Sequence, residues 1–314
     1  MKWKLVAAAL AFVSSCLPAA AADEASCRQV RFADVGWSDI AATTGLASVV
    51  LEGLGYTPSV TFASIPVALA GLKNKQIDVF LGYWSPAMTA QMEPFVKAGQ
   101  IKVLEQPNLV GARYSLAVPQ YLHDRGLKSF SDITRFRKEL QGKIYGIEPA
   151  SDGNLLIHAM IRDPQFGLQD FELVETSEAG MLAEAQRAVG GKKAIVFLGW
   201  EPHPMNLRMK MRYLAGGDAV FGANFGEAKV YTVVPSAYEA RCPNVAVFLH
   251  ALQFTTDMEN QVMGPILEKV KPNLAARNFL RKNPAVVERW LKGVTTFDGR
   301  DGLADVIAFV KRPA

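Results

Sequence analysis

Ile77–Pro86 reads IDVFLGYWSP, and Ala194–Pro204 reads AIVFLGWEPHP. Both stretches contain the apolar run VFLG, and a tryptophan follows each run within two residues. Short apolar runs separated by helical patterns are typical of parallel strands that are covered on both faces. In open parallel sheets, ligands bind beyond the carboxyl ends of the strands. We therefore expect Trp84 and Trp200 to lie at a binding cleft.

The alternation of strand and helix patterns extends along most of the chain. Strands are predicted at residues 30–35, 57–62, 77–82, 143–147, 194–198 and 229–234. Helices are predicted at residues 38–54, 65–74, 132–140, 152–161, 178–189 and 278–290, and residues 246–270 are predicted to be mostly helical. The fold class is therefore α/β. Because the strand motif occurs twice, two lobes that face each other across a cleft are expected.

The N-terminal stretch Met1–Ala22 indicates export from the cytoplasm. Lys2 and Lys4 precede an apolar run, LVAAALAFV, and three alanines come before Asp23. This order is that of a secretory signal peptide, and cleavage before Asp23 is predicted. The alternative is a lipoprotein modified at Cys16, because Val13–Cys16 loosely resembles a lipoprotein box. No later segment is expected to span a membrane.

Charge and cysteine content restrict the partners and the redox state. Removal of residues 1–22 takes away two lysines, so the formal charge falls from +4 to +2. A nearly balanced charge gives no argument for binding nucleic acid. Cys27 and Cys242 are the cysteines that remain, and in an exported protein two cysteines are expected to pair. The alternative is two separate buried thiols.

The sequence contains no recognisable catalytic motif. GxSxG, HExxH, the P-loop and a GxGxxG that opens a helix are all missing. The four histidines have no spacing typical of metal ligands, so neither a metal nor a cofactor is predicted; they are His123, His158, His203 and His250. His203 is near Trp200 in sequence, and a structural or rim role is expected for it. An enzyme is therefore not predicted.

Aromatic residues at strand-to-loop junctions are the strongest indication of a ligand. Four of them are expected at such junctions, and three closely follow a glycine; they are Trp37, Trp84, Tyr114 and Trp200. Any one of these rings alone would be interpreted as a core or rim residue. Several electron-rich ring faces around one space form the usual site for a quaternary ammonium, which has no hydrogen-bond donor on nitrogen. The sequence thus favours a cation-binding aromatic cage.

Asp39 has two interpretations. It lies at the expected start of a helix, where it could cap the helix and complement the helix dipole. If Ser38 caps the helix instead, Asp39 is free to face the cleft. A carboxylate in the cleft would attract a cation and accept a hydrogen bond from a hydroxyl group, and it would repel the carboxylate of a betaine.

Five stretches together resemble the periplasmic substrate-binding proteins of ABC importers for choline and glycine betaine, and the choline-binding branch most closely. They are DVGWSDI (34–40), DVFLGYWSP (78–86), ARYSLAVP (112–119), YGIEPASDGN (145–154) and FLGWEPHPMN (197–206). The resemblance implies a type II-like two-lobe fold, in which each lobe is a mixed, mostly parallel sheet flanked by helices. The expected lobes are 23–111 with 213–314, and 112–212.

The resemblance also implies the residues that contact the ligand. Trp37, Trp84, Tyr114 and Trp200 would surround the trimethylammonium group, and Asp39 would meet the hydroxyl group of choline. A second polar contact is expected after the GIEP segment. The family is expected to have asparagine there in its choline binders. Here that contact is assigned to Ser151 or Asn154. The family's disulfide matches Cys27 and Cys242.

The predicted function is capture of choline in the periplasm and its delivery to a membrane permease by a monomeric protein. Glycine betaine, carnitine and acetylcholine are alternative ligands, and Asp39 argues against those that carry a carboxylate. An enzyme acting on a quaternary amine and a sensor with the same fold are alternatives from other classes. Turnover would indicate the first of these, and a different partner protein would indicate the second.

Overall fold

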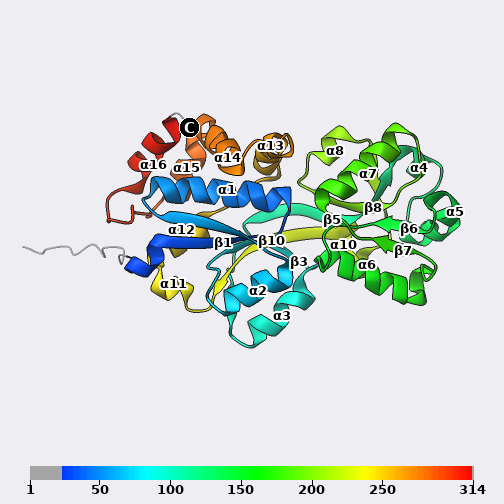
Figure 1. Cartoon of the computed structure of the whole chain (residues 1–314), viewed down its shortest axis with the longest axis horizontal. Helices are drawn as coiled ribbons and strands as arrows, with labels where there is room; N and C mark the ends of the chain where they lie inside the picture. Colours follow the sequence, from blue (N-terminus) through cyan, green and yellow to red (C-terminus); the bar gives the residue numbers. More distant parts are fainter. Residues whose placement is uncertain (1–22, 313–314) are drawn as a thin grey trace, which may run out of the picture.

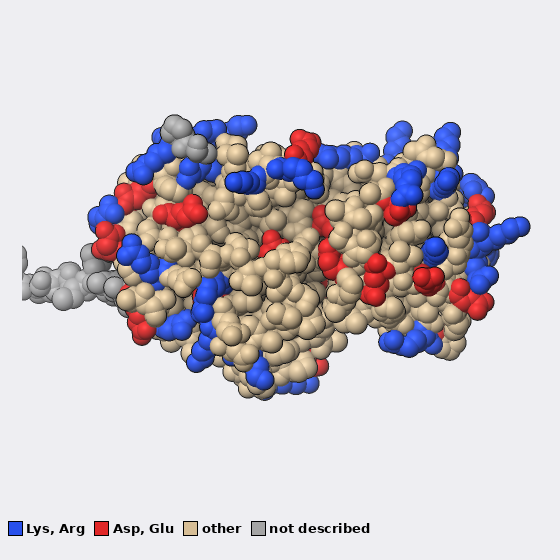
Figure 2. All heavy atoms as spheres, viewed as in Figure 1, with Lys and Arg blue, Asp and Glu red and all other residues tan. Residues whose placement is uncertain are grey.

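The computed structural model describes residues 23–312. The predicted signal peptide, its cleavage after Ala22 and the alternative lipid attachment at Cys16 concern residues that lie outside this range. Between residues 23 and 312, none of the helices combines the length and the apolar character needed to cross a bilayer. Figure 2 shows basic and acidic residues intermixed over one face of the molecule, without an extended patch of either sign.

The elements gather in two groups (Figure 1). The first group contains β1 (Gln29–Asp34), β2 (Thr57–Phe62), β3 (Phe80–Ser85), α1 (Ser38–Gly53), α2 (Ile65–Lys73), α3 (Thr89–Lys97), α11 (Tyr238–Arg241), α12 (Pro243–Ala251), α13 (Thr256–Leu267), α14 (Pro272–Lys282), α15 (Pro284–Trp290) and α16 (Gly302–Lys311). The second contains β6 (Lys143–Tyr145), β7 (Glu172–Val174), β8 (Phe197–Glu201), α4 (Gln120–Asp124), α5 (Arg137–Leu140), α6 (Asp152–Arg162), α7 (Glu178–Gly190) and α8 (Met205–Arg208).

Two long strands, β5 (Leu109–Pro119) and β10 (Glu227–Pro235), run through the middle of the molecule between these groups (Figure 1). The strand order is β3-β10-β5-β8-β6-β7, with β4 (Ile101–Val103) paired to β10 and β9 (Met211–Tyr213) paired to β5. Strand β1 pairs with β2, and a bridge between Phe32 and Val79 continues this pair toward β3. Strands β5 and β10 therefore connect the two groups.

The parallel strand pairs lie within the two groups of elements, and the antiparallel pairs involve the connecting strands β5 and β10. The pairs β1·β2, β6·β7 and β6·β8 are parallel, as the alternating pattern predicts. Strands β5 and β10 are antiparallel to every strand that they pair with. The sheets are thus mixed, and their antiparallel share is larger than the sequence pattern indicates. The reason is that the two connecting strands run against the strands of both groups.

Helix α1 forms the centre of the first group. Nearly all of its residues are buried, because it packs on α13, α14 and α16. Small residues on α1 allow this close packing. A Cβ on Gly45 would lie 3.1 Å from the backbone carbonyl of Pro272, at the start of α14. The middle of α1 therefore lies directly against α14, and its first turn carries the predicted site residue Asp39, with Trp37 immediately before the helix.

Two strands begin and end later in the chain than the sequence predicts. The sequence placed strands at 77–82 and 194–198, whereas β3 is Phe80–Ser85 and β8 is Phe197–Glu201. Antiparallel partners extend both strands past their glycines, since Val230 of β10 pairs with Trp84 and Tyr114 of β5 pairs with Trp200. Each tryptophan is therefore the second-last residue of its strand and does not lie in the loop that follows.

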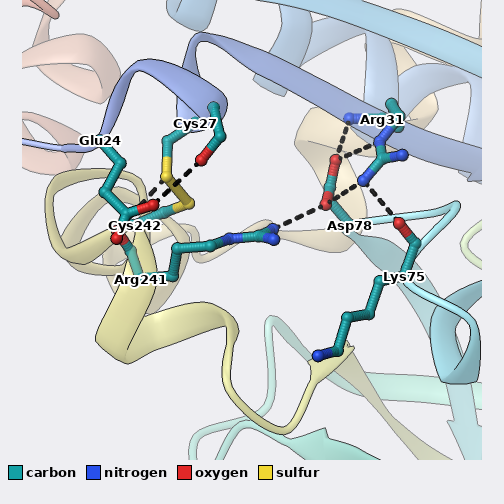
Figure 3. A network of polar contacts seen from close by, with 8 residues as sticks. Glu24, Cys27, Arg31, Lys75, Asp78, Arg241 and Cys242 are labelled. Carbon is teal, nitrogen blue, oxygen red and sulfur yellow. Dashed lines mark hydrogen bonds and ion pairs between the residues drawn. A yellow bond between two sulfur atoms is a disulfide. The ribbon is translucent and has the colours of Figure 1, made fainter.

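A disulfide and a buried ion network hold the N-terminal strand in place (Figure 3). Cys27 and Cys242 are bonded, which confirms the predicted pairing. Nearby, the buried carboxylate of Asp78 accepts two hydrogen bonds from the guanidinium of Arg31, at 2.7 and 2.9 Å, and one from Arg241 at 3.3 Å. These contacts join β1, the residues leading into β3 and α11.

Candidate binding site

A cavity lies where the two groups of elements meet. It is lined by Trp37, Asp39, Trp84, Tyr114, Ile147, Asp152 and Trp200. The structure thus brings together all four predicted aromatic residues and Asp39.

Three strands of one sheet position three of the rings. Tyr114 on β5 is the direct partner of Trp200 on β8, and their ring centroids are 6.4 Å apart at an interplanar angle of 79°. The ring of Trp84 on β3 lies 5.8 Å from that of Tyr114, at 55°. The three rings are tilted or edge-on to one another and are at most 4 % exposed. Rings arranged in this way present faces to a shared space instead of stacking on each other.

The fourth ring, Trp37, comes from the residue before α1. Gly36 has φ +94°, a conformation that favours glycine, and its N–H donates to Asp34 at 2.8 Å. This turn directs the chain from β1 into α1. The indole Nε1–H of Trp37 donates to Glu148 at 3.2 Å, in the loop before α6. Trp37 is therefore fixed between elements of both groups.

Asp39 faces the cavity from the first turn of α1. Its Oδ2 accepts a hydrogen bond from Nε1 of Trp84 at 3.1 Å, while its Oδ1 is buried without a partner. Burial, and secondly the nearby charge of Glu178, raise the pKa of Asp39 to about 7. A buried polar atom without a partner costs free energy unless a ligand satisfies it. Asp39 is therefore available to a ligand.

The start of α1 is capped differently from the prediction. Ser38 does not cap the helix, because its hydroxyl contacts the sulfur of Met263 at 3.4 Å. Instead, the backbone N–H of Ser38 donates to Oε2 of Glu178, the first residue of α7, at 2.9 Å. Of the two interpretations of Asp39, this geometry corresponds to the one in which it faces the cleft, although Glu178 rather than Ser38 binds the N–H at the helix start.

The two residues predicted as a second polar contact lie beside the cavity but not among the residues that line it. Ser151 is the N-cap of α6, and its Oγ accepts from the backbone N–H of Asn154 at 3.3 Å. The side chain of Asn154 bonds to the backbone of Ile147 and Glu148 and to the carboxylate of Glu175. Both side chains are thus used to hold their own loop.

Asp152, which follows Ser151, lines the cavity instead. Its Oδ1 accepts from the N–H of Gly153 at 2.9 Å and from the hydroxyl of Tyr114 at 3.4 Å. Its Oδ2 is buried and has no partner. Burial raises the pKa of Asp152 to about 7. The second polar group in the cavity is therefore a carboxyl group.

Further ionisable groups lie behind the cavity. His203 is buried and its ring is 5.0 Å from that of Trp200, which agrees with a structural role. Its Nδ1 accepts from the N–H of Met205, so its Nε2 carries the proton that faces Oε1 of Glu178, at 3.2 Å. On α13, burial and secondly the charge of Asp39 raise the pKa of Glu259 well above its ordinary value. Within residues 23–312, no group of acidic, histidine or cysteine side chains has a metal-binding arrangement.

Sequence reasoning missed Asp152, Glu148 and Glu178. Asp152 stood inside the quoted stretch SDGN, but nothing in the sequence distinguished it from its neighbours. Which of three polar residues at a helix start faces a cavity depends on the direction of the helix, and that direction is set by tertiary packing. Glu148 and Glu178 gave no sequence signal, since each acts on a residue more than 100 positions away.

Comparisons with known proteins agree on one family. The family model described as the substrate-binding domain of ABC-type glycine betaine transport systems matches residues 28–282. A solved structure of an ABC-transporter choline binding protein in complex with choline is 49% identical, with a TM-score of 0.90, and the match covers 92% of this chain and all of that one. An ABC-transporter choline binding protein in an unliganded semi-closed conformation is 50% identical, with a TM-score of 0.83 over 91% of this chain and 100% of that chain. Lactococcal OpuAC with glycine betaine is 25% identical, with a TM-score of 0.76 over 84% of this chain and 99% of that chain.

Proposed function

This chain belongs to the substrate-binding domains of ABC-type glycine betaine transport systems, and we propose that it captures choline for an ABC importer. The family consists of transport components and not of enzymes. Substrate-binding proteins of such importers work in the periplasm or outside the cell. We infer the periplasm for this chain, after removal of residues 1–22, and a membrane permease as the partner of a monomeric protein.

The observation that carries the proposal is the set of four aromatic rings around one buried cavity. Trp37, Trp84, Tyr114 and Trp200 all line the cavity. A trimethylammonium group has no N–H to offer, and ring faces attract it through their quadrupoles. Each cation–π contact contributes about 0.5–2 kcal/mol, so four contacts contribute about 2–8 kcal/mol, a large part of the roughly 8 kcal/mol that micromolar binding requires.

The charges around the cavity also favour a cation. Asp39 and Asp152 line it, and Glu259 and Glu178 lie close to Asp39. The cavity has no lysine or arginine among its lining residues. Buried carboxylates without a counter-ion are costly, and a bound cation reduces this cost. The ligand therefore supplies the positive charge that the site lacks.

Glycine betaine is the second candidate ligand, because the family description and the ligand of lactococcal OpuAC both name it. Its carboxylate would meet Asp39 and Asp152, both of which have a free oxygen in the cavity region. Two carboxyl groups facing a third disfavour a betaine unless protons are taken up. Choline has a neutral hydroxyl group at the same position and avoids this repulsion.

We further propose that residues 23–111 with 213–314, and residues 112–212, form the two lobes that close on the ligand. The cavity lining supports this division, since Trp37, Asp39 and Trp84 come from the first set and the other four residues come from the second. Strands β5 and β10 are the natural hinge, because they connect the two groups of elements.

Binding of choline and ethanolamine to the ligand-free protein tests the cage. Ethanolamine keeps the hydroxyl group and the charge of choline but has an N–H₃⁺ group, whose bonds to water the rings cannot replace. We expect choline to bind at least about tenfold more tightly, which corresponds to about 1.4 kcal/mol. Equal or tighter binding of ethanolamine would mean that the rings do not enclose the cationic group.

A further inference from the structure

Glu148 connects the two groups of elements beside the cavity. It lies in the loop between β6 and α6, and each of its carboxylate oxygens accepts a hydrogen bond from an N–H group. Oε2 accepts from the indole Nε1–H of Trp37 at 3.2 Å, and Oε1 accepts from the backbone N–H of Glu178 at 2.9 Å. Trp37 precedes α1 of the first group, whereas Glu178 begins α7 of the second (Figure 1). Glu148 therefore has one donor in each group.

The loop that carries Glu148 is fixed from within its own group. The side chain of Asn154 accepts from the N–H of Ile147 at 3.0 Å and donates to the carbonyl groups of Ile147 and Glu148 at 3.0 and 3.1 Å. Gly146 leaves room for this side chain, since a Cβ there would lie 2.2 Å from Oδ1 of Asn154. These bonds hold the backbone of the loop, and the bond from Glu178 holds the carboxylate.

The first group contacts the same loop at two further points. A Cβ on Gly36, which has φ +94°, would lie 3.4 Å from Oε1 of Glu148, so the carboxylate lies directly against the backbone there. On α3, Nε2 of Gln91 donates to the carbonyl oxygen of Ala150 at 3.2 Å. The loop is thus a principal contact between the two groups in the arrangement that the structure shows.

We propose that Glu148 is a positioning residue for ligand binding, because its bond across the two groups sets the orientation of the Trp37 ring at the cavity. The indole N–H is the only polar atom of that side chain, and a bond from it to a carboxylate is stronger than one between neutral groups. Glu148 does not line the cavity, so it acts on the ligand through Trp37. This inference rests on the proposed choline-binding function and adds a residue that does not touch the ligand.

Glutamine cannot replace Glu148, although the two side chains have the same shape. Both partners of Glu148 are donors, whereas an amide offers one acceptor oxygen and one NH₂ group. Glu148→Gln therefore places its NH₂ group against one of two N–H groups. We expect the affinity for choline to fall at least about fivefold, mainly through faster dissociation in stopped-flow fluorescence, because the lost bond joins the two groups.

Trp37→Phe distinguishes positioning from the effect of charge. It keeps a ring but removes the indole N–H, so the amide of Glu148→Gln can turn its oxygen to Glu178 without opposing a second donor. If Glu148 acts through Trp37, Glu148→Gln should change the affinity of the Trp37→Phe protein by about twofold or less. Equal losses in both backgrounds would overturn the proposal, since Glu148 would then act only through its negative charge.

Glu172→Gln is the matched control, because it removes the same charge from an exposed position on β7 of the second group. Its affinity for choline should stay within about twofold of the wild-type value, and a loss as large as that of Glu148→Gln would contradict the positioning role. An NMR measurement on the wild-type complex does not depend on the folding of Glu148→Gln. The indole N–H of Trp37, assigned by its absence in Trp37→Phe, should exchange slowly with water, and rapid exchange would contradict the bond.

The proteins are titrated calorimetrically with choline and with glycine betaine, after circular dichroism has confirmed that each is folded. If the wild-type protein binds glycine betaine but not choline, the proposed function is wrong. The comparison of the two backgrounds still tests Glu148 in that case, because both ligands carry the trimethylammonium group. Binding of neither ligand would contradict the proposed function and the positioning role together.

Discussion

The carboxylate of Glu178 accepts a hydrogen bond from the backbone N–H of Ser38 at 2.9 Å. Glu178 begins α7, and Ser38 begins α1, which lies in the other group of elements (Figure 1). The bond satisfies an N–H at the start of a 16-residue helix, where an anion is favoured by the helix dipole. Because the residue after Ser38 is Asp39, this contact joins the two groups of elements directly beside the binding site.

Glu178→Ala should therefore weaken choline binding by about tenfold or more, since a buried bond to a charged group contributes about 1.5–3 kcal/mol. The variant loses a contact of the closed arrangement, so small-angle X-ray scattering should show a larger radius of gyration with choline present. Glu184→Gln is the control, because Glu184 is on the same helix and pairs at the surface with Arg187. Unchanged affinity in Glu178→Ala would show that the contact does not hold the lobes together.

Trp84 has two roles in the site, one through its ring face and one through its N–H bond to Asp39. Trp84→Ala removes both and should weaken choline binding at least about tenfold. Trp84→Phe keeps a ring and should lose less affinity than Trp84→Ala. The measurement is isothermal titration, with thermal unfolding to confirm the fold. If the alanine variant bound choline as the wild-type protein does, Trp84 would not belong to the cage.

Glu259 should make the ligand-free protein less stable at higher pH. Burial, and secondly Asp39, raise the pKa of Glu259 well above its ordinary 4.5, so the folded state keeps a proton that the unfolded state releases above that pH. The free energy of unfolding then falls as the pH rises through this window. Glu259→Gln removes this effect, and its gain over the wild-type protein should be larger at pH 8 than at pH 5 by about 1.4 kcal/mol or more, the free energy of one pKa unit.

Denaturant unfolding at both pH values measures this difference. The control is Glu288→Gln, because Glu288 is an exposed glutamate on α15. The control should change the free energy of unfolding equally at pH 5 and pH 8. A gain in Glu259→Gln that is the same at both pH values would mean that Glu259 is ionised in the folded protein.

The disulfide should affect stability without affecting the site. Cys27 and Cys242 are separated by 215 residues and do not line the cavity. Cys27→Ser, Cys242→Ser and the double variant should each lose about 2–4 kcal/mol of unfolding free energy, and the double variant should lose no more than a single one. Choline affinity should stay within about twofold, as expected for distant and independent sites. A tenfold loss of affinity would show that the bridge positions the start of β1 and the cage.

Much of the fold could be predicted because its strands and helices follow local patterns. Helices α1 and α6 and strand β2 begin at the predicted residues. For α6 the reason is local, because Ser151 caps the helix. The long strand β5 was not predicted. It is antiparallel to three partners that are distant in sequence, and its residues ARYSLAVP show no strong alternation. Such a strand is defined by its neighbours and not by its own composition.

The site likewise contains residues that could be predicted from the sequence and one that could not. The rings and Asp39 could be predicted because residue type and position at a strand or helix end are visible in the sequence. Asp152 could not, because Ser151, Asp152 and Asn154 are all polar and begin the same helix. Tertiary packing determines which one faces the cavity: Gly153 of α6 lies directly against Tyr114 of β5 and Leu198 of β8, and Asp152 contacts the hydroxyl of Tyr114.

The most direct test of the account is calorimetric titration of the ligand-stripped protein, residues 23–314, with choline and then with glycine betaine at the same pH and salt concentration. We expect tight binding of choline and binding of glycine betaine that is weaker by about tenfold or more, because Asp39 and Asp152 oppose a further carboxylate. Tighter binding of glycine betaine than of choline would contradict it.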